Sequence, residues 1–272
     1  MSDHVWHFEY VSGKRGSVKN TKKNSILTGF LLIIFLLIII IVRGVLVPRF
    51  RIEKIFIDSN LNVSNEEILE RAGLSTESVL YFSVDTYVIE KRLAEWPKVK
   101  EVEVEKFFPN ALKISISSRE PLVYLLVEND GIIFPAVCDD EGIVFDAGKN
   151  MRYEGMPVIS GIGFKNFIVG AKLPDVIIAF MKNLKGVKES NPELFALISE
   201  LRFIKRGDYS FDYFIYFKGI RLPVLVNNDI SESMLKYALL IVDVVSSKVD
   251  FKKIEYIDLR GNIVSYKLRS NI

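Results

Sequence analysis

The sequence has little of the side-chain chemistry that most enzymes and metalloproteins use. Two of its 272 residues are histidine, His4 and His7, and both lie close to the start of the chain. The long remainder therefore offers no imidazole as a general base or metal ligand. No G-x-S-x-G, H-E-x-x-H, phosphate-loop or dinucleotide-binding glycine motif occurs. We expect no catalytic residue, no bound metal and no cofactor.

The chain also has only one cysteine and little net charge. The single cysteine, Cys138, excludes an intrachain disulfide and leaves too few thiols for a zinc cluster, so we expect it to be a small, partly buried apolar residue. Lysine and arginine number 36 against 34 aspartate and glutamate residues, a net charge of +2. A protein that binds nucleic acid with its whole surface is usually more basic, so nucleic acid is not an expected partner.

One apolar run dominates the first fifth of the chain. The residues from Ile26 to Val42 carry no charge, and the apolar character continues past Arg43 to Val47. Because about 20 helical residues cross the hydrocarbon core, the run predicts a transmembrane helix over 26–47. The following "RGVLVPRF" lacks the small-x-small pattern of a signal-peptide cleavage site, which favours an uncleaved anchor. Five basic residues before the run and four after it give a weak positive-inside bias, with residues 1–25 as a cytoplasmic tail.

The stretch after the anchor predicts a small two-layer domain. "RIEKIFIDSN" alternates as a strand, and Ser64 with Glu67 forms a capping box for a helix that ends at Gly73. Asp85 caps a second helix that presents Ile89, Leu93 and Trp96 on one face. "VKEVEVEK" and "ALKISISS" alternate as two further strands. The order strand, helix, helix, strand, strand lets two helices cover one face of a three-stranded sheet.

The remainder is rich in strands. Asn129-Asp130-Gly131 and the acidic Asp139-Asp140-Glu141 each mark a turn between apolar runs, and the acidic turn is expected to be solvated. Its carboxylates could serve as a glycosidase pair only in a cleft, which neighbouring turn residues do not form. Three helices are predicted, over 175–184, over "NPELFALISELRFI" (191–204) and from Ser231 to Lys248. An aromatic hairpin, "SFDYFIYFKGIRLPVLVN", turns at Lys218-Gly219, and two strands, the last over 263–268, end the pattern.

Three segments together resemble the FtsQ/DivIB family of bacterial cell division proteins. They are "IEKIFIDSNLNVSNEEIL", "LAEWPKVKEVEVEKFFPNALKISISSREP" and "YIDLRGNIVSYKL". The order Arg119-Glu120, the pair Phe107-Phe108 and Gly261 depart from the usual family residues. The resemblance implies an α+β protein: a single transmembrane helix, a β-α-α-β-β POTRA domain over 51–121, and a mixed β domain with flanking helices over 122–268, followed by a tail at 269–272.

The resemblance also implies a function without enzymatic activity. Family members are divisome scaffolds in the cytoplasmic membrane, with the N-terminus in the cytoplasm and the large domains outside it at the division septum. Their partners, single-pass coiled-coil proteins of the FtsB/DivIC and FtsL type, dock by strand addition at the C-terminal edge of the β domain. Carried over by position, the expected partner-binding residues are Asp258, Arg260, Ile263, Val264, Ser265, Tyr266, Lys267 and Leu268.

Alternatives remain open on sequence grounds. Asp258 and Arg260 can equally form a structural salt bridge within the turn. A POTRA-bearing envelope transport or assembly factor would carry a transmembrane barrel, for which the sequence leaves no room after the β domain. An anchored cell-wall hydrolase or transferase would need an acid/base pair, and no pair stands out.

Overall fold

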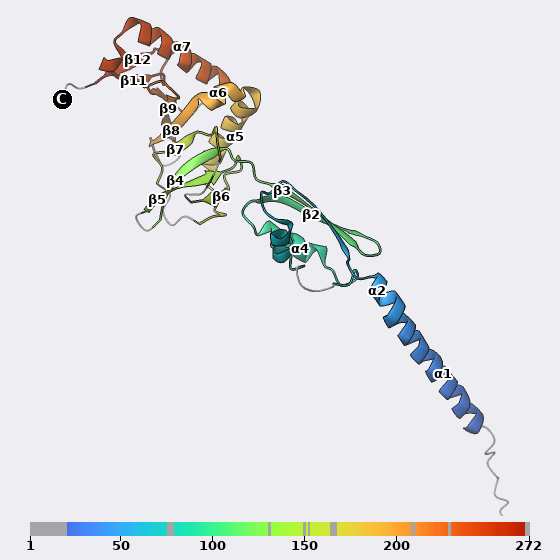
Figure 1. Cartoon of the computed structure of the whole chain (residues 1–272). Helices are drawn as coiled ribbons and strands as arrows, with labels where there is room; N and C mark the ends of the chain where they lie inside the picture. The colour runs from blue at the N-terminus through green and yellow to red at the C-terminus, as the bar shows by residue number, and fades with distance from the viewer. Residues whose placement is uncertain are drawn as a thin grey trace, which may run out of the picture. The chain divides into compact units, whose positions relative to one another are not determined.

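The structure, a computed structural model, describes residues 21–74, 79–129, 132–148, 151, 153–163, 168–207, 210–227 and 230–269. His4, His7 and residues 1–20 of the predicted tail lie outside these ranges. The chain forms two compact units. One unit contains Met1–Ile55, Ser78–Val84 and Lys106–Leu112, and the other contains the rest of the chain. Figure 1 shows the helices and strands, most of them labelled.

The N-terminal helical segment is apolar on all sides. α1 (Thr21–Ile41) continues through a π-helical stretch, η1 (Val42–Leu46), into α2 (Val47–Arg49). Leu27–Arg49 is 23 residues long, and none of its most apolar window is buried within the protein. At about 1.5 Å per residue this is enough to cross the hydrocarbon core of a bilayer. The segment therefore has the length and composition of a single membrane anchor.

The next elements follow the predicted order. They are β1 (Lys54–Ser59), α3 (Asn65–Ala72), α4 (Thr86–Ala94), β2 (Val99–Phe107) and β3 (Ala111–Ser118), with the three strands in the order β1-β3-β2. The predicted caps are confirmed: Ser64 Oγ accepts from the N–H of Glu67, and Asp85 accepts from the N–H groups of Tyr87 and Val88. Gly73 ends α3 in the left-handed region, with φ of +75°, which favours glycine.

Alternation along these strands separates a dry face from a wet one. Ile114 and Ile116 on the central strand β3 are buried, as are Ile89 and Leu93 on α4. Glu101, Glu103, Ser115 and Ser117 fall on the alternate positions and are exposed or half-buried. The two-layer domain predicted from the period-2 pattern is thus confirmed, with one face of the sheet in solvent.

The C-terminal part is built on a nine-stranded mixed sheet. Its strands are β4 (Val123–Asn129), β5 (Ile132–Cys138), β6 (Val144–Ala147), β7 (Val158–Ser160), β8 (Ile198–Lys205), β9 (Phe211–Phe217), β10 (Val224–Val226), β11 (Ile254–Asp258) and β12 (Ser265–Leu268). Their spatial order is β12-β11-β10-β9-β8-β7-β4-β5-β6. The pairs β4–β7, β7–β8 and β10–β11 are parallel, and the other five pairs are antiparallel.

Three helices flank this sheet: α5 (Asp175–Ser190), α6 (Pro192–Leu197) and α7 (Glu232–Lys248), with a short 3₁₀ turn, η2 (Phe251–Lys253), before β11. Helix α5 contributes Phe180 to the core, where its ring meets Phe203 at 4.8 Å and Tyr213 at 5.1 Å between centroids. Cys138 lies in the same core and is fully buried, whereas only partial burial was expected. The fold class predicted from the sequence is confirmed.

Two predictions about element bounds were wrong. Helix α6 ends at Leu197, and residues 198–205 form β8 instead of continuing the helix predicted over 191–204. β8 pairs with β7 on one side and β9 on the other, so backbone pairing across the sheet outweighs the local helix preference. The last strand is also shorter than predicted, because it begins at Ser265 and leaves Ile263 and Val264 in the preceding connection.

The acidic turn after β5 is not fully solvated. Only 1% of the Asp139 side chain is exposed, and its Oδ2 lies 2.6 Å from Nη1 of Arg119. Asp139 Oδ1 accepts from the N–H groups of Glu141 and Ile143, which closes the turn. The same Arg119 nitrogen lies 2.8 Å from Glu141. The expectation of a solvated turn was therefore wrong for Asp139, because a distant arginine and two local N–H groups satisfy the buried carboxylate.

Removing Arg119 should therefore destabilise the protein more than removing an exposed cation. Arg119→Ala leaves the Asp139 carboxylate buried without its counter-ion, which typically costs about 3–5 kcal/mol. Urea unfolding of the full chain in detergent micelles, followed by circular dichroism, measures the loss. Lys236→Ala, which breaks the exposed pair with Glu232, is the matched control and should shift the transition little. Equal shifts in the two variants would contradict this account.

Candidate partner-binding edge

The last strand, β12, forms one edge of the nine-stranded sheet. It pairs with β11 on one side, and no other strand in the described ranges pairs with its outer side. All four of its residues are exposed, including Tyr266 (47%) and Leu268 (57%). Ile263, just before the strand, is 81% exposed. An unpaired edge that carries apolar side chains is a surface to which another extended chain can add.

Hydrogen bonds of the neighbouring strand show which backbone groups of β12 face outward. Ile257 of β11 donates its N–H to Pro223, on the β10 side, at 3.0 Å. Ile257 stands opposite Tyr266, so these two residues form a non-hydrogen-bonded pair of the antiparallel ladder. Arg269 donates in the opposite sense, to Lys253 on the β11 side. Because N–H groups alternate along a strand, those of Tyr266 and Leu268 point to the open side.

An ion-pair network holds the connection between β11 and β12. Arg260 lies 2.6 Å from Asp258 and 2.9 Å from Asp212, and its own N–H also donates to Asp258. Asp212 comes from β9, has only 6% of its side chain exposed, and receives a second cation, Arg206, at 3.5 Å. Hydrogen bonding to Arg260 holds the pKa of Asp258 below its ordinary value. The structure thus brings Asp258 and Arg260 together as a structural pair; a partner contact by either stays a prediction.

The remaining predicted residues divide by their environment. Lys267 lies 3.0 Å from Glu255, and its ammonium is 5.6 Å from the centre of the Tyr256 ring. The hydrogen bond to Glu255 raises the pKa of Lys267. Val264 is half-buried and packs against the core, whereas Ser265 is exposed. The residues with apolar surface turned to solvent are therefore Ile263, Tyr266 and Leu268.

Sequence reasoning missed Asp212 and Glu255, which orient Arg260 and Lys267. A signal for Asp212 was present: it is the lone carboxylate inside the aromatic run "SFDYFIYF". A charge in a buried strand requires a counter-ion, and Arg260 is that counter-ion. Glu255 is a surface residue of an alternating strand and carries no comparable signal.

Two other sheet edges are partly covered by the chain itself. At β6, Val144 donates to Ala171 at 3.0 Å and accepts from Gly170 at 2.7 Å. At β2, the N–H of Val104 donates to the Glu90 carboxylate at 2.9 Å. These contacts occupy backbone groups that a partner strand would need. β12 differs from β6 and β2 in having no such cover in the described ranges.

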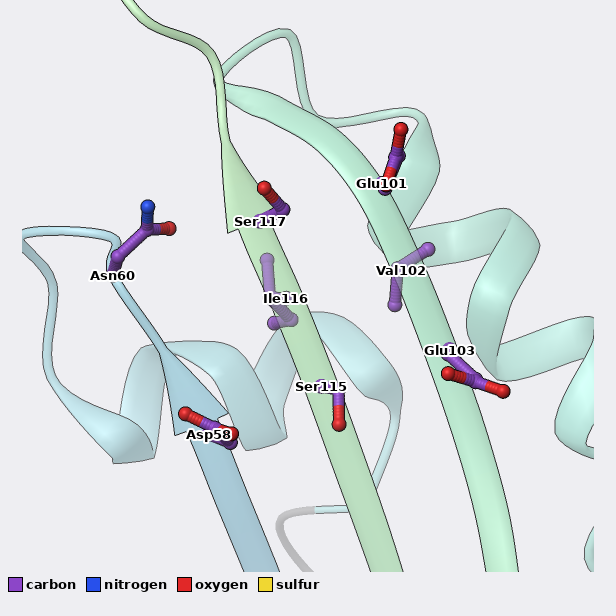
Figure 2. Close-up of a pocket in the computed structure, with 8 residues that line it drawn as sticks. All are labelled: Asp58, Asn60, Glu101, Val102, Glu103, Ser115, Ile116 and Ser117. Atoms are coloured by element: carbon purple, nitrogen blue, oxygen red, sulfur yellow. The ribbon is translucent and has the colours of Figure 1, made fainter.

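The exposed face of the three-stranded sheet forms a shallow, open hollow. Figure 2 shows Asp58 on β1, Ser115 and Ser117 on β3, and Glu101 and Glu103 on β2, spread along three strands. Within the described ranges, no group of three or more histidine, cysteine, aspartate or glutamate residues is placed to hold a metal ion. This face therefore has the character of a solvated acidic surface.

Fold and edge together define a POTRA-bearing protein with one candidate spanning helix and a mixed sheet domain. Residues 50–119 match the POTRA domain of the FtsQ type. The chain is 26% identical to cell division protein DivIB of Clostridium botulinum over 228 aligned residues. The alignment covers 83% of each of the two chains. The chain is 29% identical over 217 residues to cell division protein FtsQ of Geobacter sp. (strain M21), which covers 77% of this chain and 72% of that protein. The chain thus carries a POTRA domain of the FtsQ type and is similar, over most of its length, to cell division proteins named DivIB and FtsQ.

The Asp258–Arg260 pair makes the edge sensitive to acid. Because the pKa of Asp258 is lower in the folded chain than in the unfolded one, the pair stabilises the fold above about pH 4, and this contribution is lost as pH falls through the lowered pKa. Arg260→Gln should raise the pKa of Asp258 toward its ordinary value, as measured by carboxyl carbon NMR titration. Lys267→Gln, which removes the partner of Glu255 instead, should leave it unchanged. An unaltered Asp258 titration in Arg260→Gln would refute the assignment.

Proposed function

We propose that this chain is a non-enzymatic scaffold of the bacterial division machinery that docks partner proteins at the open edge of β12. The relatives are named as cell division proteins, which supports the role in division. The observation that carries the docking mode is the orientation of β12, whose Tyr266 and Leu268 N–H groups point away from β11. Strand addition needs such a row of outward backbone groups.

The proposed partners are single-pass coiled-coil proteins of the FtsB/DivIC and FtsL type. A short extended segment of one partner would pair with residues 265–268, while Ile263, Tyr266 and Leu268 supply apolar contacts. Each backbone hydrogen bond contributes about 0.5–1.5 kcal/mol net, so the apolar contacts are needed for a stable complex. The proposed binding surface is completed by Asp258, Arg260, Val264, Ser265 and Lys267. Asp258 and Arg260 contribute chiefly by holding the connection between β11 and β12.

The proposed topology places the N-terminus in the cytoplasm. In this arrangement residues 1–25 form the cytoplasmic tail, 26–47 span the cytoplasmic membrane, and the POTRA domain (51–121), β domain (122–268) and C-terminal tail (269–272) lie outside it. The relatives' division role implies enrichment at the septum. Attachment of scaffold and single-pass partners to one membrane raises their effective concentration, so a short β pairing suffices.

Tyr266→Pro tests strand addition directly. Proline removes the outward N–H while leaving the inward groups that pair with β11, so β12 should stay folded. One acceptor on the partner then loses its donor, which costs about 1–3 kcal/mol and should weaken binding about tenfold or more. Calorimetry or pull-down with an FtsB/DivIC-type partner from the same organism measures the loss.

Two matched variants separate the causes. Tyr266→Ala keeps the N–H but removes the ring, so it should weaken binding less than the proline variant if the backbone pairing matters most. Ser265→Pro removes an inward group and should disturb the β11–β12 pairing itself. Undiminished partner binding by a folded Tyr266→Pro variant would rule out strand addition at this edge.

A further inference from the structure

A cluster of aromatic rings surrounds the end of the apolar helix. Phe50, the residue after α2, lies 5.1 Å from Phe82 and 5.7 Å from Phe108 between ring centroids. Tyr81 contacts both of those rings, at 5.4 Å and 5.8 Å. With Phe107 they form what we call the juxtamembrane cluster: Phe50, Tyr81, Phe82, Phe107 and Phe108. All belong to the unit that contains the helix.

The juxtamembrane cluster is not a protein core. Phe82 is 70% exposed, Phe108 is 69% exposed and Phe107 is 49% exposed. Three phenylalanines with so much apolar surface in water would be unfavourable, since burying such a ring is worth about 1.5–3 kcal/mol. A contiguous exposed apolar patch marks a surface that another apolar phase covers.

Hydrogen bonds fix the juxtamembrane cluster to the end of the helix without a linker. The N–H groups of Phe50 and Arg51 donate back to Val47 and Pro48, which continues the helical pattern. The Phe50 carbonyl accepts from Tyr81 at 2.7 Å, and Ile52 donates to Val79 at 2.9 Å. The turn that carries Tyr81 and Phe82 is therefore joined to the residues that directly follow the span.

The second aromatic turn is attached in the same way. The carbonyl of Asn110 accepts from the N–H groups of Glu53 and Lys54 at 3.0 and 3.4 Å. The side-chain amide of Asn110 also donates to the Glu53 carboxylate. Phe107 and Phe108, just before Asn110, are thus held close to the residues that follow Phe50.

Basic residues accompany the rings. Arg49, Arg51 and Lys54 are exposed beside Phe50, and Lys106 lies with its ammonium 3.1 Å from the Tyr81 carbonyl and 5.4 Å from the centre of the Tyr81 ring. Aromatic rings concentrate at the membrane–water interface, and lysine and arginine there reach lipid phosphates. The combination of exposed rings, cations and direct continuity with a spanning helix matches a lipid headgroup layer.

We propose that the juxtamembrane cluster inserts into the outer headgroup layer of the membrane and is a lipid-binding surface of the POTRA domain. The inference rests on the proposed anchor and adds that the turns at 80–82 and 107–110 touch the bilayer. Contact at three separated chain segments would hold these turns at the membrane surface in addition to the helix. The lipids it fits are anionic, since the flanking charges Arg49, Arg51 and Lys106 are cationic.

Site-specific labelling of the full chain tests this proposal. Phe82→Cys and Phe108→Cys, each carrying an environment-sensitive fluorophore, are reconstituted into phosphatidylcholine/phosphatidylglycerol vesicles containing nitroxide-labelled lipid. Phe56→Cys is the matched control, because Phe56 is a comparably exposed ring (57%) on β1 and lies outside the juxtamembrane cluster. Native Cys138 does not compete for the label, since it is fully buried and burial raises the pKa of its thiol.

The labels at 82 and 108 should show blue-shifted emission and lose most of their fluorescence to the lipid-borne nitroxide. The label at 56 should keep most of its fluorescence and should be quenched by iodide from the aqueous phase. Labels at 82 and 108 that behave like the label at 56, in a chain that resists alkaline extraction, would overturn the inference and leave the anchor intact. A chain that alkali removes from the vesicles would overturn both.

Discussion

The need to pair every backbone N–H and carbonyl of a sheet decides which surface this protein leaves for others. In the C-terminal sheet, Val144 of β6 pairs with Gly170 and Ala171, whereas the N–H groups of Tyr266 and Leu268 point to the outer side of β12, where no strand of the described ranges pairs. The three-stranded sheet protects β2 by another means, a glutamate carboxylate on Val104. With β6 partly covered, β12 is the edge of this sheet at which another strand could add, which is the basis of the proposed docking.

An open edge is useful only if it is held in place before a partner arrives. The buried carboxylate of Asp212 accepts a hydrogen bond from Arg260. The same arginine forms an ion pair with Asp258, at the start of the connection to β12. Fixing this base lowers the conformational entropy that binding must overcome. The exposed pair of Lys267 and Glu255 contributes little to that rigidity, because both groups remain in water. Burial, and not the number of ion pairs, therefore determines which charges organise the site.

Aromatic residues of this chain occur in two different environments, the protein core and the exposed surface next to the apolar helix. Phe180, Phe203 and Tyr213 pack edge to face in the core of the nine-stranded sheet, where water is excluded. In the juxtamembrane cluster, four rings also contact one another, yet Phe82, Phe107 and Phe108 stay exposed in the isolated chain. The difference follows from position: the second group begins at the residue after the candidate span, where the expected surroundings are lipid headgroups rather than protein.

The sequence by itself determined the features that depend on near neighbours. The uncharged run around Leu36, the caps at Ser64 and Asp85, and the alternation through Ile114 and Ile116 all act within a few residues, and the structure confirms them. Only the tertiary structure decided that residues 198–205 pair as a strand, that Arg119 neutralises a buried Asp139, and that Tyr266 directs its N–H outward. Each of these depends on groups some 20 or more residues away or on a neighbouring strand, and no local pattern encodes which distant strand or charge will arrive there.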